Sequence, residues 1–165
     1  MTLHIRAARP GEAALVLSFV KELAEFESLS AEVDATEEMI AAALFGPSPA
    51  AFCLIAEWAG EPAGFAIYFN SFSSFRGRRG VYLEDIFVRP SHRGRGIGKA
   101  FLEHIARLCV ANGWARFEWA VLDWNEHAIE FYRSCGATLL DEWKICRVTG
   151  DALLGLAGRS GQSED

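Results

Sequence analysis

The sequence predicts a single α/β domain built around a mixed, mostly antiparallel sheet. Stretches with a strand pattern alternate with stretches of helical spacing, and no internal repeat or low-complexity linker divides the 165 residues. Apolar residues make up 51% of the chain, which is enough for one buried core. We expect the domain to span residues 3–157 and a disordered tail to follow at 158–165.

Caps and turn residues set the ends of the elements expected in the N-terminal half. Pro10 suits the first turn of a helix. Thr36 can cap a second helix, because acidic residues follow it in the first turn. Two aromatic-rich strands meet at Ala59–Pro62, a hairpin connection, and the Ser- and Arg-rich stretch 71–80 is expected to be a loop. These elements are a strand at 3–7, helices at 10–28 and 36–44, and strands at 51–58 and 63–70.

The elements of the C-terminal half are bounded in the same way. Pro90 stops a strand, and Gly113 closes the long helix that follows it. Apolar residues alternate with polar ones through the next strand. Asn125 can cap a further helix, which Gly136 ends. These elements are a strand at 81–88, a helix at 95–112, a strand at 115–122, a helix at 126–135, one or two strands within 137–148 and a short helix ending near 157.

Charge and cysteine content narrow the class of partner. The net charge of −6 argues against nucleic acid, since a phosphate backbone requires clustered Lys and Arg, and it suits a cationic substrate. The four cysteines are scattered without metal-ligand spacing, so we expect reduced thiols and no metal site. The sequence begins without a signal-peptide pattern, and no apolar run reaches the roughly 18 residues of a membrane span. We therefore expect a cytoplasmic protein with no membrane partner.

The chemistry concentrates in the glycine-rich segment Arg93–Lys99, between a strand and the long helix. Glycines let backbone N–H groups converge on one anion, and the helix adds its positive N-terminal end. A P-loop is excluded because three residues rather than four separate Gly94 from Gly98, and because Ala100 follows the lysine. The dinucleotide pattern fails because Lys99 replaces its third glycine. The segment alone predicts a pyrophosphate site, with an ordinary glycine-rich turn as the alternative.

Several blocks together resemble the GNAT superfamily of N-acetyltransferases. The segment Arg93–Gly98 resembles the acetyl-CoA-binding signature of that superfamily. Other blocks are similar to its diamine (spermidine/spermine) acetyltransferase branch: Lys21–Ala24 with Glu27, Tyr82–Val88, Trp124–Glu126, Phe131–Tyr132 and Gly136–Ala137. The resemblance covers residues 3–157 and implies one N-acetyltransferase domain. Its sheet would contain a central parallel pair, Tyr82–Val88 and Ala115–Leu122, that splays apart and is flanked by helices.

The resemblance implies two catalytic residues. Glu84 would take the proton from the amine, directly or through water, because an alkylammonium with a pKa of about 10 cannot attack. Tyr132 would donate a proton to the departing thiolate, and a backbone N–H within Ile86–Val88 would stabilise the oxyanion. On the residues alone, Glu84 could instead anchor an arginine or a backbone amide, and Tyr132 could be a packing residue.

The resemblance also implies acetyl-CoA as the co-substrate. Its expected contacts lie on the strand end, the loop and the following helices: Ile86, Phe87, Val88, Arg93, Gly94, Arg95, Gly96, Ile97, Gly98, Lys99, Asn125 and Tyr132. Asn125 could equally serve only as a helix cap. The basic group Arg76–Arg79 could meet the CoA phosphates or be a solvated loop.

The acceptor implied is a small cationic amine held by Glu27, Glu84 and Asp85. Separated carboxylates suit a polyamine, because each ammonium loses its hydration on binding. The sequence departs from the diamine branch at Phe26, where Tyr is frequent, and at Glu25, where Lys is common. The acceptor could therefore be a lysine analogue, an aminoglycoside or a protein lysine. Outside enzymes, the alternative is a non-catalytic acetyl-CoA sensor. The family further implies a homodimer.

Overall fold

The computed structural model describes residues 2–159. The chain divides into two compact units, Met1–Trp124 and Asn125–Asp165, and each is described by itself. The single domain expected over 3–157 stays a prediction. Most of the tail expected at 158–165 lies outside the described residues, which end at Arg159.

The first unit is built on a five-stranded sheet in the order β1-β2-β3-β4-β5. Its strands are β1 (Leu3–Ala7), β2 (Phe52–Trp58), β3 (Glu61–Ser73), β4 (Arg78–Val88) and β5 (Phe117–Trp119). The first four pair with their neighbours in antiparallel fashion, whereas β5 runs parallel to β4. The expected mixed, mostly antiparallel sheet is therefore confirmed.

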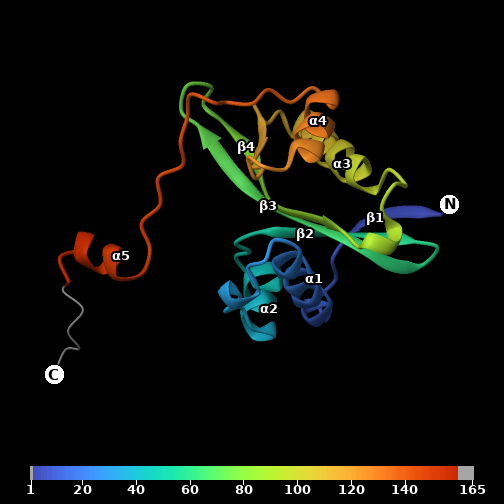
Figure 1. The fold of residues 1–165 in the computed structure, drawn as a ribbon, viewed down its shortest axis with the longest axis horizontal. Coiled ribbons are helices and arrows are strands. Elements are labelled where there is room, and N and C mark those ends of the chain that lie inside the picture. Colours follow the sequence, from blue (N-terminus) through green and yellow to red (C-terminus); the bar gives the residue numbers. More distant parts are fainter. Residues whose placement is uncertain (1, 160–165) are drawn as a thin grey trace. The chain divides into compact units, whose positions relative to one another are not determined.

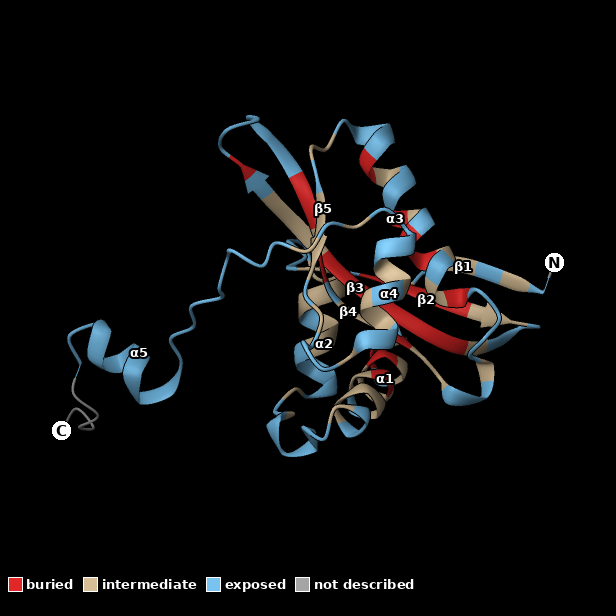
Figure 2. Ribbon diagram, turned by 45° about the horizontal axis from the view of Figure 1, so that its top comes forward, coloured by how far each residue is buried: buried red, intermediate tan, exposed pale blue. Residues whose placement is uncertain are grey.

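Helices cover both faces of this sheet (Figure 1). One face carries α1 (Ala13–Phe26) and α2 (Glu37–Phe45), joined through the short helix η1 (Ser30–Glu32), and the other carries α3 (Ile97–Asn112), which follows η2 (Pro90–His92). Burial is concentrated along the strands and on the inward sides of α1 and α3 (Figure 2). This arrangement is the α/β fold that the sequence predicts.

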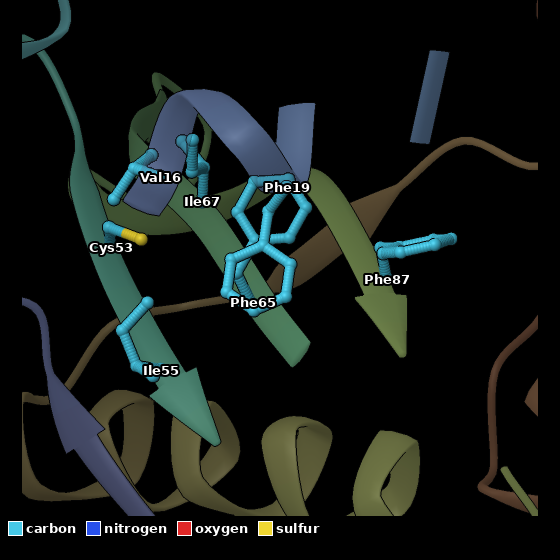
Figure 3. Packing of buried hydrophobic residues seen from close by; sticks show 7 residues of the cluster. All are labelled: Val16, Phe19, Cys53, Ile55, Phe65, Ile67 and Phe87. Atoms are coloured by element: carbon cyan, nitrogen blue, oxygen red, sulfur yellow. The ribbon is translucent and has the colours of Figure 1, made fainter. Parts of the chain in front are cut away.

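The core beneath α1 is aromatic at its centre. The rings of Phe19 and Phe65 stack at a centroid distance of 5.3 Å, and Figure 3 shows them one over the other between α1 and β3. The cluster consists of Val16, Phe19, Cys53, Ile55, Phe65, Ile67 and Phe87. Because it includes β4 through Phe87, the cluster ties α1 to the strand that leads into the glycine loop.

Several expected boundaries are corrected. α1 begins at Ala13 rather than Pro10, because Gly11 has a left-handed φ of 97°, which a helix cannot include. The loop expected at 71–80 is mostly strand: the ladder runs on to the pair Ser73 and Arg78, and only 74–77 turn. Backbone conformation sets the first boundary and backbone hydrogen bonding sets the second.

The second unit contains α4 (Glu126–Ser134) and α5 (Gly150–Leu156). The strands expected within 137–148 are wrong, since this stretch of the described chain forms none. A strand requires a partner for its N–H and C=O groups, and the described part of this unit offers no other strand. Most of the apolar residues of 137–148, including Trp143 and Ile145, are instead exposed.

We expect Ala59→Asn to stabilise the protein. Ala59 and Gly60 form the two-residue turn between β2 and β3, with φ values of 52° and 85°. A left-handed conformation costs an ordinary L-residue roughly 1–2 kcal/mol, whereas Asn-Gly is the preferred pair for this turn. Urea denaturation should show the free energy of unfolding rising by about 1 kcal/mol.

The matched control is Gly60→Ala. A Cβ at Gly60 would meet nothing within 4 Å, so this change introduces backbone strain without a clash, and we expect a destabilisation of about 1 kcal/mol. If both variants unfold like the wild type, the turn does not hold these two residues in left-handed conformations.

Candidate active site

An extra residue in β4 shapes the candidate site. The ladder between β3 and β4 pairs Ile67 with Asp85 but the next residue, Tyr68, with Leu83. Glu84 is therefore the additional residue of a β-bulge, which bends the strand and shifts its alternation. Asp85 shares a face with its partner Ile67, on the side that α1 covers, whereas Glu84 is exposed.

Beyond the bulge, one edge of β4 is open. β5 pairs with β4 only over Val81–Leu83, and among the described residues no strand continues this pairing. The N–H of Arg89 donates to the Ala63 carbonyl of β3 at 2.8 Å, so by strand alternation the N–H groups of Ile86 and Val88 point to the opposite, open side. The expected parallel pair is thus joined only at its start.

Three carboxylates gather where this edge opens. The pKa of Asp85 is raised to about 6, mainly because burial disfavours the charged form, and further because Glu84 and Glu27 add negative charge. Glu27 is the C-terminal cap of α1. The structure therefore brings together the three residues expected to bind the amine. A half-buried carboxyl among like charges favours a cationic ligand.

The glycine-rich loop has the backbone geometry of an anion site. Gly94 and Gly96 have left-handed φ values of 77° and 76°, which glycine adopts without strain. Gly96 is the N-cap of α3. Among the described residues, no side chain forms a capping hydrogen bond at this end. The first-turn N–H groups are therefore available to an anion. Lys99 adds a positive charge in this turn, 3.9 Å from Glu103.

Two arginines expected to bind the cofactor lie over aromatic rings. The Arg93 guanidinium lies 4.8 Å from the centre of the Phe26 ring, and its Nε donates to the Val88 carbonyl at 2.9 Å. Arg95 lies 4.8 Å over the Trp58 ring. The sequence gives no local signal for these contacts, because each aromatic partner comes from a distant element. These contacts hold the two arginine side chains of the loop against α1 and β2.

Asn125 and Tyr132 belong to the second unit and are described within it. Asn125 Oδ1 accepts a hydrogen bond from the Ala128 N–H at 3.2 Å, which confirms the expected helix cap. Burial raises the pKa of Tyr132, so its hydroxyl stays protonated at neutral pH. A protonated hydroxyl has the form that a general acid requires, and the catalytic role of Tyr132 stays a prediction.

The sequence predicts neither a metal site nor a membrane span. Within residues 2–159, no group of three or more His, Cys, Asp or Glu side chains is placed to hold a metal ion. Over the same range, no helix combines the length and the apolar character that crossing a bilayer requires.

Comparison with known proteins identifies the family of this chain. The model of the acetyltransferase (GNAT) family matches residues 17–137. A thialysine N-epsilon-acetyltransferase from Bos taurus is 39% identical, covering 94% of this chain and 97% of its own length. The human spermidine/spermine N(1)-acetyltransferase-like protein 1 is 30% identical over 93% of this chain, which corresponds to 24% of that longer protein.

A solved structure extends the likeness to the fold. An integron cassette protein from the mobile metagenome of V. cholerae superposes with a TM-score of 0.79 at 28% identity, covering 95% of this chain and 98% of that one. The family match spans the open edge of β4, the glycine loop and α4. The chain therefore belongs to the acetyltransferase (GNAT) family.

Proposed function

We propose that this protein is an acetyl-CoA-dependent N-acetyltransferase that acts on the primary amine of a small cation such as thialysine or a diamine. The gathering of Glu27, Glu84 and Asp85 beside the open edge of β4 carries this proposal. One relative is named for thialysine, an analogue of lysine, and another for spermidine and spermine. Both types of acceptor present a primary ammonium on a flexible chain, which separated carboxylates can hold.

The loop and the open edge fit acetyl-CoA. The uncapped end of α3, together with Gly94 and Gly96, would bind its pyrophosphate, with Lys99 adding charge. The pantetheine arm would lie along the unpaired backbone of Ile86–Val88 and form hydrogen bonds with it, as an additional strand does at the edge of a sheet. When bound, acetyl-CoA supplies the acetyl group that the reaction transfers.

Three groups of the chain would divide the proton and charge chemistry. Glu84, exposed at the bulge, removes a proton from the ammonium, directly or through water. The N–H groups of Ile86 and Val88 donate to the carbonyl oxygen as negative charge develops on it. Tyr132 gives its proton to the departing sulfur. Asp85 and Glu27 hold the other ammonium group of the substrate, which does not react.

An amine panel tests this function. Release of CoA is measured with thialysine, lysine, spermidine, an aminoglycoside and a lysine-containing peptide. We expect thialysine and spermidine to be turned over most efficiently. Binding of acetyl-CoA without turnover of any amine would favour a non-catalytic sensor, and turnover of the peptide alone would move the acceptor to a protein lysine.

The oligomeric state and the cellular location are inferred from the sequence alone. The family resemblance implies a homodimer, and light scattering at two protein concentrations measures it. A cytoplasmic location remains a prediction from the sequence.

We expect Tyr132→Phe to lower kcat by roughly 10²-fold, the usual contribution of a general acid, with little change in the Kd of acetyl-CoA. Tyr68→Phe is the matched control, since Tyr68 is a buried tyrosine of the core and should leave kcat unchanged. A Tyr132→Phe enzyme with wild-type kcat would remove this hydroxyl from the reaction.

We expect Asp85→Asn to stabilise the protein at high pH. The folded-state pKa of Asp85 is about 6, above its ordinary value of 3.8. The folded state therefore retains a proton that the unfolded chain releases, and the free energy of unfolding of the wild type falls as pH rises through this interval. Urea denaturation at pH 8 should show the variant more stable by about 1 kcal/mol or more, with the difference lost at pH 4.

The same substitution reports on amine binding. An ionised Asp85 attracts the ammonium, so the KM of the wild type for thialysine should fall as pH rises through about 6. The Asp85→Asn enzyme should have a higher KM that lacks this step. A step that persists in the variant would belong to another group.

A further inference from the structure

Two arginines that follow β4 hold one stripe of α1. Phe19, Glu22 and Phe26 recur at helical spacing and lie on one face of the helix. The Arg89 guanidinium donates twice to the Glu22 carboxylate, at 3.0 Å each, and lies 4.4 Å from the centre of the Phe19 ring. Arg93 lies over Phe26, one turn further on. The C-terminal half of α1 is thereby fastened to the segment that enters the glycine loop.

Arg93 is held from more than one element. Its guanidinium lies 5.6 Å from the centre of the Phe87 ring as well as over Phe26, and the two rings are 6.4 Å apart. Its Nε is bonded to the Val88 carbonyl. Arg93 therefore links α1 to β4 at the residue where the loop begins, through the attraction between a cation and ring faces.

The end of α1 connects Phe26 to Glu27, one of the three carboxylates of the candidate site. The N–H of Leu29 donates to the Ala24 carbonyl at 2.7 Å, and Ser28 has a left-handed φ of 59°. This is the closed pattern of a Schellman-type helix end. Because Glu27 follows Phe26 directly within this bonded turn, a displacement of Phe26 also displaces the Glu27 carboxylate.

We propose that Arg93 and Phe26 are positioning residues that couple binding of the amine to binding of CoA. The inference rests on the proposed function and goes beyond it by linking its two half-sites. A pyrophosphate bound in the loop would further restrict the motion of Arg93 at its start. Phe26 and then Glu27 are held in turn, so the amine meets a preorganised carboxylate. By thermodynamic linkage, the amine tightens CoA binding by the same factor.

Calorimetry with CoA and thialysine measures this coupling. CoA lacks the acetyl group, so the two ligands bind together without reacting. The Kd of CoA is measured without and with saturating thialysine, and acetyl-CoA turnover is followed on the same protein. For the wild type we expect thialysine to lower the Kd of CoA by about fivefold or more, within the usual range of coupling between sites.

The variants separate positioning from simple support of the fold. In Phe26→Leu and in Arg93→Gln, the ratio of the Kd of CoA without thialysine to that with thialysine should fall to about one. The double variant should show no further loss of coupling. Phe26→Tyr retains the ring and should retain the coupling. Phe52→Leu is the matched control, because Phe52 is similarly exposed, 41% against 49% for Phe26, and it stacks on Tyr68 rather than on an arginine.

The outcomes distinguish the two proposals. An active wild type without coupling, or a Phe26→Leu enzyme that couples as well as Phe52→Leu, overturns the positioning role and leaves the proposed function standing. Weaker CoA binding in Arg93→Gln with unchanged coupling would make Arg93 a direct phosphate contact instead. A wild type that neither binds acetyl-CoA nor turns over an amine removes the proposed function and this inference together.

Discussion

The extra residue at Glu84 determines which groups of β4 reach the site. Before the bulge, the N–H of Val81 donates toward β5, to Arg116 at 2.9 Å, and after it the N–H of Arg89 donates toward β3. In an uninterrupted strand these two residues would donate to the same side, since their separation is even. The bulge therefore turns the N–H groups of Ile86 and Val88 to the open edge and places Asp85 on the α1 face. The proposed base, the proposed oxyanion donors and the proposed amine site all depend on this one insertion.

The features that the sequence predicted well are those decided by neighbours along the chain. Thr36 and Asn125 accept the expected capping hydrogen bonds, and Gly113 closes α3 with a left-handed φ of 67°, because caps depend on local chemistry. Strand limits depend instead on a partner. β3 and β4 therefore extend into 71–80 from both sides and leave only 74–77 as a turn, while the apolar stretch 137–148 forms no strand in the described chain.

The same distinction between local and long-range contacts applies to the candidate site. Residue type and spacing indicated the glycine loop, whereas the family resemblance implied the carboxylates of Glu27, Glu84 and Asp85. The bulge could not be predicted, because it exists only in the register between two strands. The contact between Arg93 and Phe26 was equally hidden, since it joins α1 to a segment far along the chain. What pairs and packs across elements is the part that required the structure.

The half-buried carboxyl of Asp85 is best understood as a group arranged for a partner. Its ionisation is opposed by burial and by two further carboxylates, so at neutral pH it lowers the stability of the fold rather than adding to it. The two arginines that follow β4 are engaged elsewhere, Arg89 with Glu22 and Arg93 with the Val88 carbonyl. A group that is unfavourable in the free protein and sits at an open edge is typical of a functional site. In the proposed function, a substrate ammonium would supply the positive charge that this carboxylate lacks, and the free energy lost in burying Asp85 would be recovered on binding.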